Sequence, residues 1–305
     1  MSTKKSKAAK ISIASVSLLI LLKVVASILT GSISIRADAI HSVIDLLGVI
    51  VGYIGVRISD KPPDEQHTFG HGKAENIASF IIAVLIFIAA GTIFYEAIRR
   101  IIVGRPIELI TVGIYVTAVA IVINGAASWY ALKVARSTDS AALEATAHHM
   151  FADVLSSCAV LVGLISVRLT GLSILDPIVA LLVAILITRT AYLTIKRSLG
   201  DLVDVKLPEA EENAIRSCLQ EHEGELVSFH KLRTRRAGSQ RYVDLHLVIP
   251  KHATVEEAHR LCDRLEVEIK ASLPDISINI HVEPCSTKCN QCPLSCKEVP
   301  DKTLR

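Results

Sequence analysis

The chain has 305 residues, of which 51% are hydrophobic and 21% are charged. A formal net charge of only +3 does not indicate a nucleic-acid partner. The apolar residues gather in long runs in the first two thirds of the chain, which speaks against a series of soluble domains. We therefore predict a membrane domain over residues 1–200, a soluble domain over 201–285 and a cysteine-rich tail over 286–305.

Six stretches are long and apolar enough to cross a bilayer, which takes about 20 residues of helix. They are Ile11–Thr30, Ser34–Val56, Ala74–Ala97, Glu108–Val134, Ala141–Leu169 and Ile174–Ile195. The basic start leads into a run that is too long for a signal peptide and has no small-residue cleavage site, so we expect it to stay as the first helix. An even number of spans, with more Lys and Arg on the terminal side, predicts that both termini are cytoplasmic.

The soluble part changes its pattern after Pro208. Two stretches that alternate apolar and polar residues flank Gly238 and predict a hairpin. The later helix begins with a capping box of Thr254 and Glu257. The order of helix, strand, strand, helix and strand predicts an α+β domain with its helices on one face of a sheet. The predicted elements are Glu209–Glu221, Leu226–Arg235, Arg241–Ile249, Thr254–Ser272 and Ile276–Val282.

One short pattern occurs twice in the apolar part, as His41-x-x-x-Asp45 and His149-x-x-x-Asp153. Residues four apart lie on one face of a helix, so each pair can present an imidazole and a carboxylate to a common point. Two such helices would supply a tetrahedral site for a divalent metal. Ionisable side chains at membrane depth are usually functional. The alternative is that each pair is a satisfied polar contact that packs the helices.

The ligand types favour Zn²⁺ at this site, because Mn²⁺ and Mg²⁺ prefer more oxygen ligands. Histidine titrates near neutral pH and binds metal only when it has lost its proton. Protons and metal would therefore compete for the same nitrogen atoms, which would couple their movements.

A second group of possible ligands lies in the loop between the second and third stretches. Asp64, His67 and His71 have spacings that allow a carboxylate and two imidazoles to chelate one metal. The alternative is a solvated polar loop in which Gly70 and Gly72 form turns.

The tail contains four cysteines, Cys285-x3-Cys289-x2-Cys292-x3-Cys296. A cytoplasmic segment of this kind is not a disulfide framework. The thiolates could bind Zn²⁺ or another soft metal. An iron–sulfur cluster is less consistent with the first interval and with the lack of a Pro after Cys296. A redox-sensitive or unbound tail is the third possibility.

The sequence resembles the cation diffusion facilitators, and in particular their zinc-type members. The resemblance rests on residues 37–45, on residues 64–75 and on the pattern from His149 to Asp153. It implies six transmembrane helices, a cytoplasmic metallochaperone-like (ferredoxin-like) domain, a homodimer, and exchange of a metal ion for protons. A His at position 41 resembles the zinc-selective members.

The resemblance also implies roles outside the transmembrane pair. It implies that the loop of Asp64, His67 and His71 holds an interfacial Zn²⁺. Lys73 would form a salt bridge at the dimer contact, with Asp204 or, as the second choice, with Asp201. The cytoplasmic domain would hold a binuclear metal site, with Glu283 where an Asp is often found. The ligands of that site would be His230, His246, His259, His281 and Glu283.

These features predict a proton-coupled antiporter in the plasma (inner) membrane that exports divalent transition metals, above all Zn²⁺, from the cytoplasm by alternating access. The expected partners are metal ions, protons, the lipid bilayer and a second copy of the chain. A broader exporter of Cd²⁺, Co²⁺ or Fe²⁺ and a metal sensor that does not transport are the alternatives. An intramembrane metallohydrolase is disfavoured, because no His-Glu-x-x-His occurs and four protein ligands would close the site.

Overall fold

The computed structural model describes residues 2–30, 33–103, 110–170, 174–222 and 224–285. The chain divides into two compact units, Met1–Leu202 and Val203–Arg305. The first consists of helices, and the second contains a small sheet.

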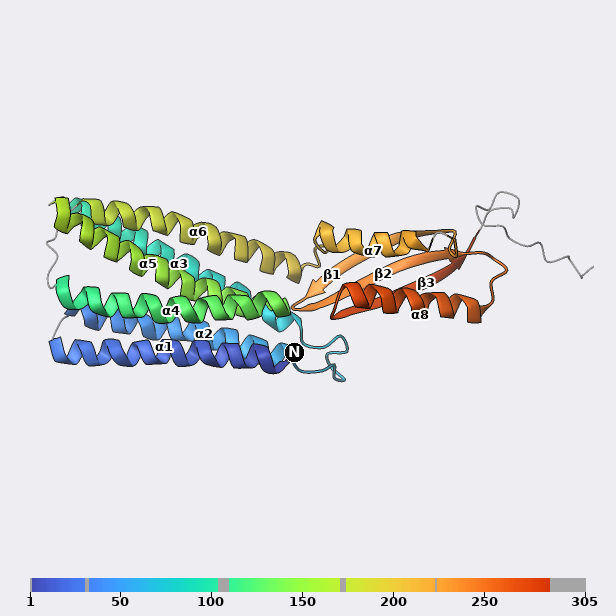
Figure 1. The fold of residues 1–305 in the computed structure, drawn as a ribbon, viewed down its shortest axis with the longest axis horizontal. Coiled ribbons are helices and arrows are strands. Elements are labelled where there is room, and N and C mark those ends of the chain that lie inside the picture. Colours follow the sequence, from blue (N-terminus) through green and yellow to red (C-terminus); the bar gives the residue numbers. More distant parts are fainter. Residues whose placement is uncertain (1, 31–32, 104–109, 171–173, 223, 286–305) are drawn as a thin grey trace, which may run out of the picture. The chain divides into compact units, whose positions relative to one another are not determined.

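The first unit is a bundle of six long helices that lie side by side (Figure 1). Three stretches of the described residues are long and apolar enough to cross a membrane, namely Lys73–Arg99, Ala118–Thr138 and Pro177–Leu202. The helices are α1 (Ser2–Thr30), α2 (Ile33–Ser59), α3 (Lys73–Val103), α4 (Ile110–Thr138), α5 (Ala141–Thr170) and α6 (Leu175–Leu202).

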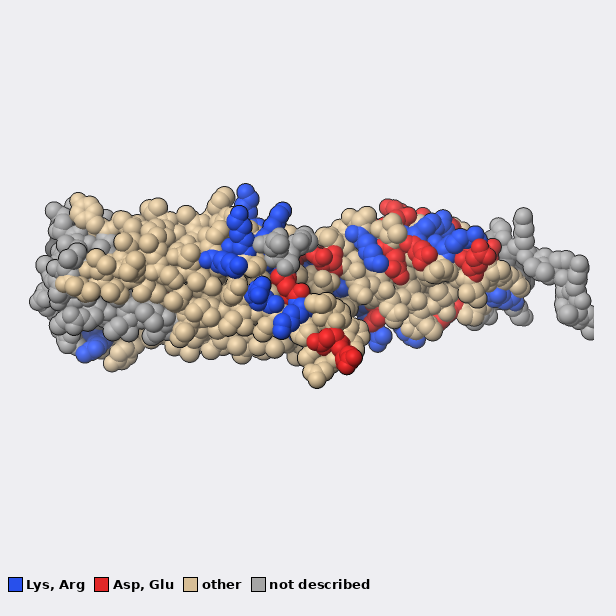
Figure 2. Space-filling view, turned by 90° about the horizontal axis from the view of Figure 1, so that it is seen from below, with Lys and Arg blue, Asp and Glu red and all other residues tan. Residues whose placement is uncertain are grey.

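Charged residues are unevenly placed along this bundle. On the face shown in Figure 2, Lys and Arg gather toward one end of the helical unit, and most of its described length is uncharged. Large apolar side chains such as Leu21, Ile88 and Val122 point outward along the helices. A largely apolar outer surface with most of its Lys and Arg toward one end suits a bundle that is solvated by lipid.

Small residues allow α2 to approach its neighbours closely. A Cβ atom on Gly52 would lie 2.0 Å from Thr146 Oγ1 of α5, and one on Gly55 would lie 2.4 Å from Ala78 Cβ of α3. Helices in lipid associate through such close packing, since burial of apolar surface gives little driving force there.

A buried carboxylate connects four of the helices. Glu75 of α3 is fully buried and accepts hydrogen bonds from Lys5 Nζ of α1 at 3.2 Å and Ser59 Oγ of α2 at 3.0 Å. Its second oxygen accepts from the backbone N–H of Ala141, at the start of α5, at 3.0 Å. Because the first N–H groups of a helix have no partner within the helix, Glu75 also caps α5.

The second unit has the predicted order of elements, with α7 and α8 placed before and between the strands (Figure 1). The sheet order is β1-β2-β3, in which β1 and β2 are antiparallel and β2 and β3 are parallel. The capping box of Thr254 and Glu257 is present, and Gly238 forms the hairpin turn at φ 61°. The elements are α7 (Glu209–Glu221), β1 (Ser228–Ala237), β2 (Gln240–Ile249), α8 (Val255–Ser272) and β3 (Ile276–Pro284).

One apolar core joins both helices to one face of the sheet. Alternate residues of β2, from Val243 to Ile249, are buried in it, and the residues between them lie on the other face. The helices contribute Ile215 and Leu219 from α7 and Leu261, Leu265 and Ile269 from α8. The opposite face of the sheet is thereby left to polar side chains.

We expect Glu211→Ala to destabilise this unit by about 3 kcal/mol near neutral pH, because two buried arginines would lose their carboxylate. Arg236 Nη2 and Arg241 Nε are 2.6 and 2.8 Å from the Glu211 oxygens. Burial opposes the charge on Glu211, but hydrogen bonds from Arg241 and Arg236 outweigh it and hold its pKa below the ordinary 4.5. This stabilisation is therefore present above the ordinary pKa and is lost as the pH falls through the folded-state pKa.

Thermal unfolding of the full-length protein at several pH values measures this effect. Glu212→Ala is the matched control, since its partners Lys206 and Arg216 are largely exposed and such pairs contribute little. Equal stability of the two variants at neutral pH would contradict the prediction.

Candidate metal sites

Helices α2 and α5 bring three of the predicted transmembrane ligands together. Asp45 of α2 meets His149 and Asp153 of α5, and one ligand atom from each lies within 4.8 Å of the others. His149 Nε2 is 3.8 Å from Asp45 Oδ1 and 3.3 Å from the Asp45 backbone oxygen. His149 is 3% exposed and Asp45 is 8% exposed. His41 lies in α2, but its side chain is outside the described part of the structure.

This arrangement is suited to a cation. Two carboxylates in a poorly solvated place repel each other, and a divalent ion between them removes the repulsion. His149 adds a nitrogen ligand, and His41 precedes Asp45 by one helical turn on the same face of α2. The donor set of carboxylates and imidazole suits Zn²⁺ and related transition metals.

Gly48 is a positioning residue that the sequence analysis missed. A Cβ atom there would lie 3.2 Å from both Cδ2 and Nε2 of His149, so glycine leaves room for the imidazole. The sequence does contain a pattern that indicates a close approach here. Gly48 and Gly52 are four residues apart and follow Asp45 on one face of α2.

We expect Gly48→Ala to reduce metal transport roughly tenfold, because displacement of a ligand by a fraction of an ångström disturbs a geometry that must be held closely. Alanine favours helix more than glycine does, so the loss would not reflect a weaker helix. Gly91→Ala in α3 is the matched control, since nothing lies within 4 Å of its added Cβ. Equal flux through the two variants in proteoliposomes would contradict this role.

The loop between α2 and α3 brings Asp64, His67 and His71 together as the spacing predicts. Asp64 Oδ1 accepts the backbone N–H groups of Gln66 at 3.0 Å and His67 at 2.7 Å. Its other oxygen is 3.4 Å from His71 Nε2, and the two imidazole rings are 4.4 Å apart. The backbone N–H of His67 is the main reason that the pKa of Asp64 is lowered.

The loop site has a feature that a merely solvated loop would not need. His71 Nδ1 is buried and has no hydrogen-bond partner among the described residues. The other ring nitrogen, Nε2, faces the Asp64 carboxylate, so a cation between Nε2 and Asp64 would leave the proton of the ring on Nδ1. The residues present therefore suit a divalent ion that is bound by Asp64, His67 and His71.

The sheet of the second unit places three histidines in one row. His230 pairs with His246 across β1 and β2, and His246 pairs with His281 across β2 and β3. Their ring centroids are 5.3 and 4.6 Å apart. Because they alternate with the buried residues of β2, the imidazoles occupy the face opposite the helices.

Glu283 closes this row from β3. Its oxygens are 2.6 Å from His246 Nδ1, 3.3 Å from His230 Nε2 and 3.8 Å from His281 Nε2. The hydrogen bond from His246 is the main cause of the lowered pKa of Glu283. An ionised carboxylate and several imidazoles together form a good ligand set for transition metals. Glu can supply that carboxylate in place of the Asp that the family often has.

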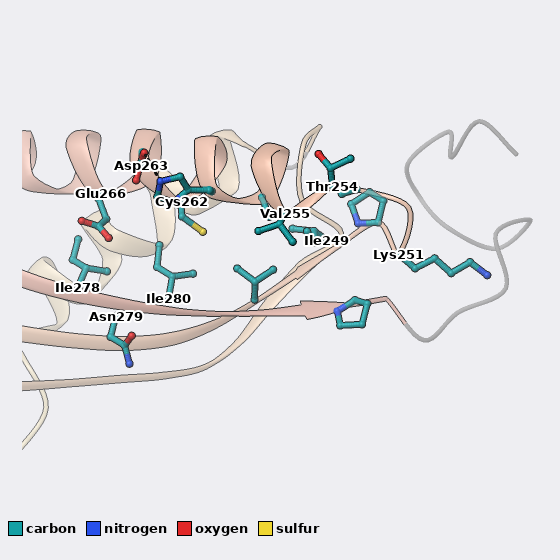
Figure 3. Close-up of a pocket in the computed structure, with 16 residues that line it drawn as sticks. Ile249, Lys251, Thr254, Val255, Cys262, Asp263, Glu266, Ile278, Asn279 and Ile280 are labelled. Atoms are coloured by element: carbon teal, nitrogen blue, oxygen red, sulfur yellow. Dashed lines mark ion pairs between the residues drawn. The ribbon is translucent and has the colours of Figure 1, made fainter. Parts of the chain in front are cut away.

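The structure does not bring His259 to this cluster. His259 lies on α8, which covers the other face of the sheet, and its Nε2 is 3.4 Å from Asp263 of the same helix. It lines a cavity of about 520 Å³ between α8 and β3, together with Cys262 and Ile280 (Figure 3). Within one chain the sheet separates His259 from His230 and Glu283, so the prediction that His259 shares their site stays a prediction.

The predicted contacts of the tail and of Lys73 are only partly visible. Cys285 is buried at the end of β3, while Cys289, Cys292 and Cys296 lie outside the described residues.

Lys73 Nζ donates to the backbone oxygen of Leu202 at 3.3 Å. Asp201 Oδ2 accepts from Asn76 Nδ2 at 2.9 Å, and Asp204 Oδ1 is 3.5 Å from Arg235 Nη1. Lys73 and Asp204 belong to different units, so their salt bridge stays a prediction.

Comparison with known families matches nearly the whole chain. The family model described as the cation efflux transmembrane domain matches residues 9–203, and that of the cation efflux protein cytoplasmic domain matches residues 207–285. The chain belongs to the cation efflux family. This family membership makes it an integral membrane protein that transports metal ions, as the resemblance to cation diffusion facilitators implied. The tail after residue 285 lies outside both matched regions.

Relatives of this cation-efflux protein align with it over most of their length. It is 34% identical over 263 residues to the uncharacterized transporter sll1263 of Synechocystis sp., covering 86% of this chain and 85% of the relative. It is 33% identical over 281 residues to the cation-efflux pump FieF of Salmonella typhi, covering 92% and 93%. A solved structure of CzrB in its Zn form is 43% identical, covers 27% of this chain and 94% of that one, and has a TM-score of 0.26.

Proposed function

We propose that this protein is a proton-coupled antiporter that exports divalent transition metals, most of all Zn²⁺, from the cytoplasm by alternating access. The observation that carries the proposal is that the buried Asp45 and His149 meet the half-buried Asp153 between α2 and α5. Together with His41 they form the site of the transported ion. All six long helices span the membrane in this account, and both termini lie on the cytoplasmic side.

The coupling to protons follows from the surroundings of His149. Its Nε2 faces two acceptors, the carboxylate and the backbone oxygen of Asp45, which favour a proton on this nitrogen when no metal is bound. In this proposal Nδ1 carries a proton as well, so the ring of the empty site is an imidazolium and has one proton to release. A metal can bind there only after that proton has left. Metal that enters from the cytoplasm releases protons, and protons that enter from the other side displace the metal.

The choice of Zn²⁺ rests on the ligands. Two imidazoles and two carboxylates form a tetrahedral set, which Zn²⁺ accepts readily. A broader exporter of Cd²⁺, Co²⁺ or Fe²⁺ differs only in selectivity, because these ions accept the same ligand types.

The remaining sites support regulation and assembly in this proposal. Zn²⁺ at the loop of Asp64 and at the row of His230 and Glu283 would respond to cytoplasmic metal and hold two copies of the chain together. The second unit would act as a ferredoxin-like regulatory domain of the homodimer, and Lys73 with Asp204 would secure the contact. The tail cysteines would offer a further soft-metal site. The comparisons give no support for an iron–sulfur cluster, and we do not propose one.

Flux measurements in proteoliposomes test transport against the sensor alternative. With a zinc dye and a pH dye inside the same vesicles, Zn²⁺ should move against a proton gradient, and a protonophore should remove the coupling. Competition by Cd²⁺, Co²⁺, Fe²⁺ and Mn²⁺ ranks the selectivity. Zinc binding without any flux would favour a sensor, and flux that ignores the pH gradient would rule out antiport.

A further inference from the structure

The two helices of the second unit share a cluster of metal-ligand side chains that none of the sites above uses. Cys218 and His222 lie one turn apart at the C-terminal end of α7, and Glu268 faces them from α8. One ligand atom of each residue lies within 4.8 Å of the others. Residues four apart on a helix point the same way, so α7 presents both a sulfur and a nitrogen to Glu268.

The hydrogen bonding of His222 orients its free nitrogen toward the cluster. Nδ1 lies 3.1 Å from the backbone oxygen of Cys218, which only accepts, so Nδ1 carries a proton and donates it. The lone pair of the neutral ring is then on Nε2, 3.5 Å from Glu268 Oε2. Two acceptor atoms that face each other call for a cation between them, and a backbone carbonyl that fixes the ring is typical of metal-binding histidines.

The spacing of the ligand atoms agrees with a tetrahedral Zn²⁺ site. Bonds of about 2.3 Å to sulfur and 2.0–2.2 Å to nitrogen and oxygen, at tetrahedral angles, place neighbouring ligand atoms roughly 3.3–3.6 Å apart. Glu268 Oε2 is 3.6 Å from Cys218 Sγ and 3.5 Å from His222 Nε2. A metal can therefore enter with little movement of either helix.

We propose that Cys218, His222 and Glu268 form a binding site for a thiophilic divalent metal such as Zn²⁺ or Cd²⁺. On binding, the S–H bond of Cys218 breaks, the proton passes to solvent, and the thiolate sulfur bonds to the metal. His222 Nε2 and a Glu268 oxygen supply two more ligands, and water takes the fourth position. The Glu268 side chain is 46% exposed, which leaves a path for entry. The metal joins α7 to α8 and does not depend on transport.

Alkylation of the full-length protein tests the site directly. Iodoacetamide labelling, followed by mass spectrometry, reports the rate at Cys218 separately from that of every other thiol. Zn²⁺ should slow labelling of Cys218 at least about tenfold, since a metal-bound thiolate is shielded. Cys262, a half-buried thiol of α8 outside the cluster, is the internal control and should keep its rate.

Variants separate metal binding from a conformational effect. His222→Ala and Glu268→Gln should each lose the protection, while Asp153→Asn in the transmembrane site should keep it, so failure of this site and failure of transport are distinguishable. In a background in which Cys285, Cys289, Cys292 and Cys296 are replaced by Ser, Co²⁺ should add a thiolate charge-transfer band that disappears when Cys218→Ser is added. Labelling of Cys218 that Zn²⁺ does not slow, or protection that survives in both His222→Ala and Glu268→Gln, would overturn the proposal.

Discussion

Replacing Asp153 with Asn should abolish zinc transport in proteoliposomes and leave the protein folded. The half-buried Asp153 shares a cluster with Asp45 and His149. The change removes a charge and a strong oxygen ligand while keeping the shape of the side chain. Loss of a direct ligand reduces metal affinity by at least about 100-fold, since even second-shell changes reduce it 10- to 100-fold. At cytoplasmic metal levels the site would then stay empty of metal.

Two matched controls separate loss of the ligand from general damage to α5. Glu144→Gln neutralises another carboxylate of the same helix, one that pairs with Arg197 outside the cluster, and should leave flux near the wild-type rate. His148→Ala removes an imidazole next to His149 that lies 3.5 Å from Thr194 Oγ1. Its effect should be far smaller than that of His149→Ala. Undiminished flux through Asp153→Asn would refute the assignment of the site.

Lys5→Ala should reduce the free energy of unfolding by about 3–5 kcal/mol, the largest stability effect that we expect. The change leaves the fully buried Glu75 without the ammonium group that now lies 3.2 Å away. A buried charge that loses its partner is destabilising by this amount, whereas removing both charges is often nearly neutral. Lys5→Met combined with Glu75→Gln, which removes both charges and keeps a side-chain acceptor for Ser59 and Ala141, should therefore regain much of the lost stability.

Thermal unfolding in detergent measures this series. Lys4→Ala is the matched control, because Lys4 is the neighbouring residue on α1 and is exposed. A Lys5→Ala protein that unfolds at the same temperature as Lys4→Ala would show that the buried pair does not hold the four helices together.

Local patterns were enough to predict the elements of the fold. Unbroken apolar runs correspond to six helices, and alternation with period two corresponds to the strands, since both signals depend only on neighbouring residues. The spacing of Asp64, His67 and His71 also predicts a local meeting. Local spacing alone could not predict the contact of Asp45 with His149. That prediction also required the assumption that two helices with the same pattern face each other.

Contacts between distant residues could not be predicted in this way. Glu75 meets Lys5, a residue 70 positions away, and Cys218 meets Glu268 across 50 positions. Nothing in the local sequence specifies which helices pack together. The row of histidines depends on strand register, which a bulge between His230 and Arg233 shifts. For the same reason the sequence alone could not predict that His259 lies on the other side of the sheet from His230 and His246.

Counting the protons released when zinc binds tests the central claim most directly, that one buried site holds either metal or protons. Titration calorimetry in buffers of different ionisation enthalpy gives this number. The background variant Asp64→Ala, Glu283→Ala, Cys218→Ser, Cys289→Ser and Cys292→Ser weakens the other proposed sites, the tail cysteines included. The account predicts that this background binds Zn²⁺ with release of protons, and that adding Asp153→Asn removes both. Zinc binding that survives Asp153→Asn, or binding that releases no protons, would contradict it.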